Sequence, residues 1–273
     1  MTNRHSDGSA GDADYSRIGK GYALIRRPDP RIAAHILDAL GDARTVLNVG
    51  AGAGSYEPVD RTVTAVEPSA SMRAQRPPQL SSAIDAMSDH LPFDDDSFDA
   101  SMASVTVHQW PDLAAGLAEM RRVTTGPVVI LTFDPVPPVH WWLIDYVPEL
   151  FEVESRRMPS IATIVRALGG SSEVRTIMIP RDCVDGFGQA FFARPERLLE
   201  PEVRRAMSAW SFLPPEVAAR FVFELRSDLA SGEWDSLYGE FRNLPEFDGG
   251  LRLVVGRRAA GYRQAVGPAE PAR

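Results

Sequence analysis

Short apolar strands in the first half of the chain restrict its fold class more than any other feature. They are rich in β-branched residues and show little polar alternation, which is typical of strands covered on both faces. They occupy residues 45–50, 62–67, 83–87, 98–105 and 127–133. Helical patterns separate several of them, notably 69–75 and 111–123. This alternation predicts a doubly wound α/β domain with a mostly parallel sheet.

A helix is predicted just before the first strand. Asp29 is a capping residue, Pro30 suits the first helical turn, and apolar residues then recur at helical spacing until Gly41. Two more strands are predicted at 173–180 and 251–258. The prediction for the whole chain is thus seven strands.

The stretch between the last two predicted strands has a different character. Its segments are of helical character and are broken by prolines, which favours a helical cap inserted into the α/β domain. We expect most of its aromatic residues to fill the core of the cap and some to line a substrate pocket. They are Phe187, Phe191, Phe192, Trp210, Phe212, Phe221, Phe223, Trp234, Tyr238, Phe241 and Phe247.

Four parts are therefore expected along the chain. Residues 1–28 form a mobile N-terminal tail and cofactor lid, because the first fourteen are polar and rich in Gly, Ser and Asp. The α/β domain spans 29–180 and the cap spans 181–247. The last strand and a C-terminal tail occupy 248–273.

Composition excludes several classes of protein. The net charge of −8 with scattered arginines argues against nucleic acid or an anionic membrane as a partner. The single cysteine, Cys183, forms no intrachain disulfide, and no Cys/His group has the spacing of metal ligands, so a metal-free fold is expected. The N-terminus lacks an apolar stretch, and we expect a cytoplasmic protein.

The strand 46–49 runs into glycines at alternate positions, Gly50, Gly52 and Gly54. Without β-carbons, these residues let a ligand approach the backbone at the edge where doubly wound sheets bind nucleotides. The next strand ends in Glu67, whose carboxylate can accept both hydroxyls of a ribose. The dinucleotide pattern G-x-G-x-x-G opens a long helix, but only residues 55–61 separate Gly54 from the next strand here.

With these motifs the chain resembles the class I S-adenosylmethionine-dependent methyltransferases, within them the type 11 small-molecule group. The resemblance covers about residues 40–135 and implies a seven-stranded sheet whose last strand is antiparallel. It rests on motifs in one order along the chain: the glycine strand, Glu67 with Pro68-Ser69-Ala70-Ser71-Met72, Leu91-Pro92-Phe93 with Asp94-Asp95-Asp96-Ser97-Phe98-Asp99, Val107-His108-Gln109-Trp110, and Glu119-Met120-Arg121-Arg122-Val123.

The resemblance also implies which residues bind S-adenosylmethionine. Its methionine part would face the glycine strand, its ribose would bind Glu67, and its adenine would lie near Met72, Met87 and Ser88. Ser104 and Val105 would flank the methyl donor. Tyr15, Tyr22 and Arg26 lie in a stretch that folds over the cofactor in similar enzymes. The full predicted set is Tyr22, Asn48, Gly50, Ala51, Gly52, Gly54, Glu67, Pro68, Met72, Met87, Ser88, Ser104 and Val105.

Three features depart from the family pattern. Asn48 replaces the acid usual in the first motif, the helix after the glycines is nearly absent, and Met87 stands where an Asp that contacts adenine is common. The carbonyl oxygen of Asn48 can still orient the cofactor's ammonium group. Backbone groups near Met87 and Ser88 can read the adenine.

Methyl transfer requires alignment of two reactants and needs a general base only when the acceptor must lose a proton. His108 is the candidate base because it follows the fourth strand and titrates near neutral pH. The alternative is that His108 and Trp110 cap the strand or bind substrate. His140 with Trp141 and Trp142 either shapes the acceptor pocket or belongs to the core.

The sequence thus predicts a methyltransferase that acts on a small, partly apolar molecule under the cap. A non-catalytic S-adenosylmethionine-binding or scaffold protein is the alternative, motivated by Asn48 and Met87. A nicotinamide-dependent oxidoreductase shares the glycine strand and Glu67 but not the later motifs.

Overall fold

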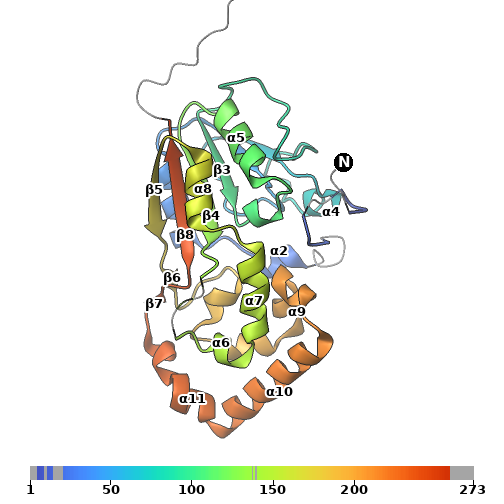
Figure 1. The fold of residues 1–273 in the computed structure, drawn as a ribbon, viewed down its shortest axis with the longest axis vertical. Coiled ribbons are helices and arrows are strands. Elements are labelled where there is room, and N and C mark those ends of the chain that lie inside the picture. The colour runs from blue at the N-terminus through green and yellow to red at the C-terminus, as the bar shows by residue number, and fades with distance from the viewer. Residues whose placement is uncertain (1–4, 9–10, 15–20, 137, 139, 259–273) are drawn as a thin grey trace, which may run out of the picture.

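The computed structural model describes residues 5–8, 11–14, 21–136, 138 and 140–258. It has an α/β part built on one sheet and a helical part beside the carboxyl ends of the parallel strands (Figure 1). The chain passes between the two parts more than once, so neither part is a separate stretch of sequence.

The sheet has six strands in the order β2-β1-β3-β4-β8-β5. The first four run parallel, whereas β8 runs antiparallel to both of its neighbours. This arrangement confirms the predicted doubly wound class and its antiparallel last strand. The strands are β1 (Thr45–Val49), β2 (Thr62–Val66), β3 (Ala100–Ser104), β4 (Val128–Phe133), β5 (Ser171–Thr176) and β8 (Leu251–Arg257).

The predicted number of seven strands in the sheet is wrong by one, because the main sheet has six strands among the described residues. Segment 83–87 forms only single bridges, Val66 to Ile84 and Met87 to His90. It lies outside β2 with no strand beyond it, and Ile84 is exposed, so nothing extends the ladder. The predicted strand 173–180 is also divided, because β5 ends at Thr176 and β6 (Ile179–Pro180) pairs instead with β7 (Glu246–Phe247).

Helices cover both faces of the sheet (Figure 1). α3 (Pro30–Leu40) lies on one face, and α5 (Leu113–Val123) with α8 (Ile161–Leu168) lies on the other. Along β4, Val129 and Leu131 join the apolar cluster of α3, while Val128 and Ile130 join that of α5 and α8. The strand is therefore buried on both faces, as its unbroken apolar sequence predicts.

Side-chain caps fix where the helices of the α/β part begin. Asp29 accepts a hydrogen bond from the Arg31 amide at 3.0 Å, and Pro30 occupies the first position of α3. Ser69 accepts one from the Met72 amide at 3.2 Å and begins α4 (Ala70–Arg73). The short helix α2 (Tyr22–Ile25) precedes α3.

The helical part draws on two stretches of the chain. α6 (Leu143–Tyr146) and α7 (Pro148–Arg157) come before β5, and they contact helices that lie between β6 and β7. β6 and β7 pair where the longer stretch leaves and returns, so its two ends lie side by side. The longer stretch holds α9 (Pro201–Arg205), α10 (Pro215–Ser231) and α11 (Glu233–Tyr238). It also holds the short 3-10 helices η2 (Gly188–Phe191), η3 (Pro195–Leu199), η4 (Ser208–Phe212) and η5 (Gly239–Asn243). A further 3-10 helix, η1 (Val107–Gln109), follows β3.

Aromatic side chains form the core of the helical part. Trp142 is fully buried, donates from Nε1 to the Phe192 carbonyl at 2.8 Å, and meets Trp234 edge-on with ring centroids 5.5 Å apart. Trp141 is buried too, so both tryptophans belong to the core, while His140 is exposed. The cluster continues into the α3 face of the sheet, so the helical part shares its core with the α/β part.

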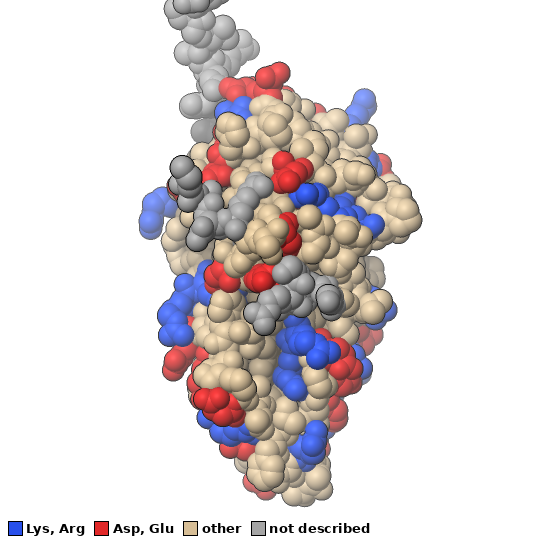
Figure 2. Space-filling model, turned by 90° about the vertical axis from the view of Figure 1, so that its right-hand side faces the viewer, with Lys and Arg blue, Asp and Glu red and all other residues tan. Residues whose placement is uncertain are grey.

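On the face shown in Figure 2, arginines and acidic side chains are interspersed, so neither sign of charge dominates it. Within the described residues, no helix is both long and apolar enough to cross a membrane.

A buried ion pair joins the beginning of the helical part to α2. Asp185, just after β6, has a fully buried side chain and accepts from Arg26 Nε at 2.6 Å. It also accepts from the Tyr56 hydroxyl at 2.9 Å, and Tyr56 follows the glycine strand. Burial and the facing Asp185 raise the pKa of Tyr56, so this hydroxyl remains a donor. Asp185 therefore connects three segments that are distant in sequence.

The contribution of the Arg26–Asp185 ion pair should be measurable as a change in the free energy of unfolding. Asp185→Asn leaves the Arg26 guanidinium buried without its counter-charge, and we expect the free energy of unfolding to fall by about 3–5 kcal/mol. Asp182→Asn is the control, since its side chain is 80% exposed and its partner Arg31 also binds Asp29; we expect a loss below about 0.5 kcal/mol. Urea unfolding followed by tryptophan fluorescence measures both, and equal losses would contradict the role of Asp185.

Candidate active site

Three cavities lie along the edge formed by the carboxyl ends of β1, β2 and β3. We call them the outer pocket, the inner pocket and the cap cavity. The outer pocket is lined by Gly50, Glu67, Pro68, Ala86, Met87, Ser88, Thr106, Gln109, Trp110 and Pro111. The inner pocket is lined by Tyr22, Asn48, Gly50, Ala51, Gly52, Ala53, Ser55, Glu67, Met72, Ser104, Val105 and Thr106.

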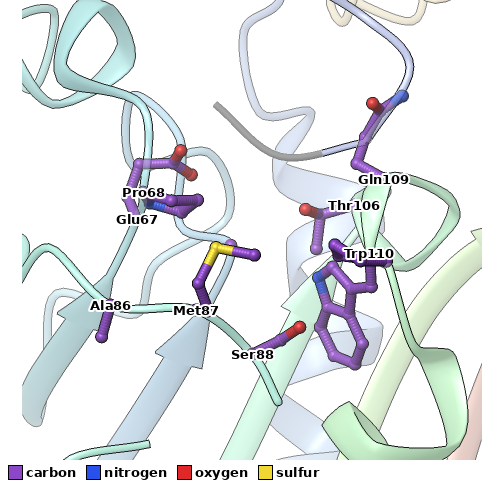
Figure 3. Close-up of a pocket in the computed structure, with 10 residues that line it drawn as sticks. Glu67, Pro68, Ala86, Met87, Ser88, Thr106, Gln109 and Trp110 are labelled. Atoms are coloured by element: carbon purple, nitrogen blue, oxygen red, sulfur yellow. The ribbon is translucent and has the colours of Figure 1, made fainter. Parts of the chain in front are cut away.

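The outer pocket is a slot between Glu67 on one side and the indole of Trp110 on the other, with Met87 between them (Figure 3). Gly116 in α5 makes room for this indole, because a β-carbon there would lie 2.6 Å from Trp110 Cε3. Such an apolar slot with a carboxylate at one end suits a flat ring system joined to a hydroxylated group.

Glu67 is held at the end of β2 by two backbone amides. Its Oε2 accepts from Gly52 N and its Oε1 from Ser69 N, each at 2.8 Å. Burial raises the pKa of Glu67 above its ordinary value, although the two amides oppose that shift. Each carboxylate oxygen keeps a further lone pair, so Glu67 can still accept two hydroxyl donors from a ligand.

Glycine is required at position 50. Its φ is 69°, and a β-carbon would lie 2.3 Å from Thr106 Oγ1. Its amide donates to Val66 O at 2.9 Å, which turns the chain sharply at the end of β1. Gly54 also has a positive φ, but it makes space for Leu80 and lines neither pocket.

Asn48 lines the inner pocket, and its side-chain amide is held in place. Its Nδ2 donates to Glu57 Oε1 at 3.0 Å, and Glu57 forms a buried ion pair with Arg76 at 2.8 Å. This contact fixes the amide, and Oδ1 is left buried with no hydrogen-bond partner among the described residues. An oxygen in this position is ready to accept from a ligand, and an ammonium group matches it chemically.

Other buried oxygens in these pockets also lack partners within the described part of the chain. They are the hydroxyls of Ser55, Ser88 and Ser104. Buried polar groups are usually hydrogen-bonded, so this set fits a polar ligand that spans the outer and inner pockets.

The structure brings together nearly all of the residues predicted to bind the cofactor. Gly54 alone among them lines neither pocket. Tyr22 reaches the inner pocket from α2, as a lid residue would. Arg26 lines the cap cavity, and Tyr15 lies outside the described residues. Thr106 and Ser55 were not predicted, since neither belongs to a motif that stands out in sequence.

Described residues of the N-terminal segment contact the same edge. Asp7 accepts from the hydroxyls of Ser69 and Ser71 at 2.7 and 2.6 Å, and Asp12 pairs with Arg157 at 2.6 Å. Gly8 also passes close to Pro68, whose carbonyl oxygen would lie 2.5 Å from a β-carbon. This part of the segment predicted to be mobile is thus anchored by polar contacts beside the outer pocket, at Ser69 and Ser71, and at Arg157 of the cap cavity.

The cap cavity lies between the sheet edge and the helical part, and about 500 Å³ of space, part of it open to solvent, lies within its lining. Tyr22 and Val105 line both this cavity and the inner pocket, so the two spaces meet at these side chains. Val105 has a φ of 51°, which is strained for a β-branched residue. The cavity is lined by Tyr22, Arg26, Val105, His108, Phe133, Glu154, Arg157, Met158, Phe187, Gly188, Gln189, Ala206, Met207, Ser208 and Ala209.

His108 lies in the cap cavity as a neutral imidazole. Burial, with a further contribution from Arg157, lowers the pKa of His108 to about 3. With its amide oriented to satisfy its neighbours, Gln109 accepts from His108 Nε2 at 2.9 Å and from Arg157 Nη2 at 2.7 Å, and donates to Asp12 at 3.2 Å. Nδ1 is left with a lone pair and no partner among the described residues.

Glu154 of α7 is a cavity residue that the sequence did not single out. Its carboxyl group accepts no hydrogen bond from any described residue, and burial raises its pKa to about 7. Glu154 and Arg157 share one face of α7 at i and i+3, Met158 directly follows the helix, and all three line the cavity. That spacing marks a common face but does not say what the face covers.

Comparisons with known proteins agree with this geometry. Residues 47–128 match the family model described as a methyltransferase domain. A candidate methyltransferase from an antibiotic biosynthesis pathway of Anabaena variabilis is 30% identical, with a TM-score of 0.79; the match covers 85% of this chain and 98% of that one. The chain therefore belongs to the S-adenosylmethionine-dependent methyltransferases, and S-adenosylmethionine is its cofactor.

More distant structures share the fold. An S-adenosylmethionine-dependent methyltransferase of Thermotoga maritima is 15% identical with a TM-score of 0.50, covering 89% of this chain and 96% of that one. Phosphoethanolamine N-methyltransferase 2 of Haemonchus contortus, in complex with S-adenosyl-L-methionine, is 15% identical with a TM-score of 0.51, covering 90% and 57%. No curated protein gave a significant match.

The fit of Trp110 against α5 gives a test of the outer pocket. Gly116→Ala should push the indole into the slot, and we expect S-adenosylhomocysteine to bind about tenfold more weakly, equivalent to about 1.4 kcal/mol. Gly239→Ala is the control, since its β-carbon would approach nothing closer than 3.9 Å. Calorimetric titration measures both variants. Unchanged affinity in Gly116→Ala would show that the slot does not hold the ligand.

Proposed function

We propose that this enzyme transfers a methyl group to a small, partly apolar molecule bound in the cap cavity. The observation that carries the proposal is the junction at Tyr22 and Val105, which border both the inner pocket and the cap cavity. A methyl group held at the end of the inner pocket would face an acceptor across these side chains. The walls of the cavity support the substrate class, because Phe133, Phe187 and Met207 are apolar.

The residues of the two pockets would divide the cofactor among them. We infer that Glu67 accepts the ribose hydroxyls and that the outer pocket holds adenine between Met87 and Trp110, with Ser88 at its edge. Asn48 Oδ1 and the backbone at Gly50, Ala51 and Gly52 would hold the methionine part. The remaining proposed contacts come from Tyr22, Pro68, Met72, Ser104 and Val105.

When bound, S-adenosylmethionine supplies a methyl carbon that is attacked in line with its bond to sulfur. The protein's task is then alignment and the exclusion of water. The helical part provides both, because its residues close the cavity opposite the strand ends. We propose that α6 and α7 act as part of the cap together with residues 181–247.

His108 stays a proposed participant, and its environment favours positioning over proton transfer. A neutral imidazole whose Nε2 donates to Gln109 keeps Nδ1 as an acceptor. Its low pKa makes it a weak proton acceptor at physiological pH. We infer that His108 accepts a hydrogen bond from the acceptor molecule and so orients it.

Binding of the cofactor product tests the proposal first. S-adenosylhomocysteine should bind the parent protein, and Glu67→Gln should weaken binding about 10- to 100-fold through loss of charge-assisted hydrogen bonds. Because burial raises the pKa of Glu67, affinity should also decline on acidification earlier than an ordinary glutamate would cause. Calorimetry across pH measures both effects.

Glu173→Gln on β5 is the matched control, since its side chain is exposed and paired with Arg175; its affinity should equal the parent's. Absence of binding by the parent protein would refute the proposal. Binding without turnover across a broad acceptor panel would favour a non-catalytic protein of the same fold.

A further inference from the structure

Among the residues that the structure describes, the charges around the cap cavity are balanced except at one residue. Arg26 is neutralised by the buried Asp185, and Arg157 is neutralised by Asp12, which contacts both its Nε and its Nη2. Neither arginine therefore brings an uncompensated positive charge for an anionic molecule. Glu154 is the one acidic residue that lines the cavity, and its carboxyl group has no hydrogen-bonded partner among the described residues.

We propose that the acceptor molecule of this methyltransferase carries a cationic amine and that the Glu154 carboxylate binds this ammonium group. The inference rests on the proposed function and narrows its substrate class. Glu154 is half-buried, and a carboxylate partly withdrawn from water is costly to ionise unless it is paired. An ammonium group supplies both the missing charge and hydrogen-bond donors. Phe133, Phe187 and Met207 provide the apolar surface for the rest of the molecule.

The state of Glu154 in the protein agrees with this role. Burial raises its pKa to about 7, and the attraction of Arg157 on the same helix only partly offsets that shift. The other charged or titratable groups that face the cavity are Tyr22, His108 and Arg26, with Asp12 and Asp185 behind the arginines. Binding of an ammonium group near neutral pH would return Glu154 to its ionised form and release a proton.

Matched probes separate charge from shape. Protein saturated with S-adenosylhomocysteine is titrated at pH 8 with 2-phenylethylamine, 2-phenylethanol and phenylacetate, and with the corresponding indole series tryptamine, tryptophol and indole-3-acetate. We expect the amine of a series to bind at least roughly tenfold more tightly than its alcohol and its acid. At pH 7, the heat of amine binding should vary with the ionisation enthalpy of the buffer, because a proton is released.

Variants on α7 assign the effect to one carboxyl group. Glu154→Gln should weaken amine binding about 10- to 100-fold and leave alcohol binding unchanged. Glu152→Gln is the control, because Glu152 lies on the same helix with an exposed side chain; it should behave as the parent. Glu154→Gln should unfold at the same or a higher temperature at pH 8, since ionising a carboxyl whose pKa is raised in the folded state destabilises that state above the pKa.

Two kinds of failure are distinguishable. If the parent does not bind S-adenosylhomocysteine, the methyltransferase proposal itself fails. If it does bind, the amine assignment is overturned when no amine of either series binds, when alcohols or acids bind as well as amines, or when Glu154→Gln leaves amine affinity unchanged.

Discussion

The ion pair of Arg26 with Asp185 holds together the segments that surround both ligand spaces. Its two charges are buried and come from α2 and from the loop after β6, while Tyr56 brings the end of the glycine strand to the same carboxylate. The Gly186 amide adds a hydrogen bond to Ile25 O at 3.0 Å. A buried pair of this kind adds little net stability but is costly to break, so it favours one arrangement of the lid over others. Tyr22 is placed at the junction of the two cavities by this arrangement, because Arg26 Nη1 donates to its hydroxyl at 3.1 Å.

The end of β3 shows how local strain serves the same junction. Val105 adopts a left-handed conformation that costs of the order of 1–3 kcal/mol, and its amide donates to Leu131 O at 2.7 Å. The turn directs Thr106 into the space left by the missing β-carbon of Gly50. It also starts η1, which carries His108 into the cap cavity and is followed by Trp110 in the outer pocket. The strained turn at Val105 thus separates the outer pocket, which Trp110 lines, from the cap cavity, which His108 lines.

The residues that line the outer and inner pockets could be predicted from the sequence far better than those that line the cap cavity. Gly50 and Glu67 follow directly on strands that apolar runs identify, and the carboxyl ends of parallel strands meet at one edge. The segment 83–87 shows the limit of that reasoning, because its composition is that of a strand but it has only one neighbour to pair with. Glu154 reaches the cavity only because α7 packs against η4 and α6 against α10. No local pattern encodes contacts between stretches that lie so far apart.

Asn48 illustrates how a departure from a family pattern becomes intelligible once its neighbours are known. An acid at this position would face Glu57 at the 3.0 Å distance that Asn48 Nδ2 now spans, and Arg76 already neutralises Glu57. Two carboxylates so close in a buried site cannot both ionise without a large penalty. The amide avoids that repulsion and donates to Glu57, and its side chain lines the inner pocket with a carbonyl oxygen that has no hydrogen-bond partner among the described residues. The negative charge thus lies on Glu57, behind Asn48, where Arg76 neutralises it. A ligand ammonium in the inner pocket would therefore meet an oriented dipole instead of a direct ion pair.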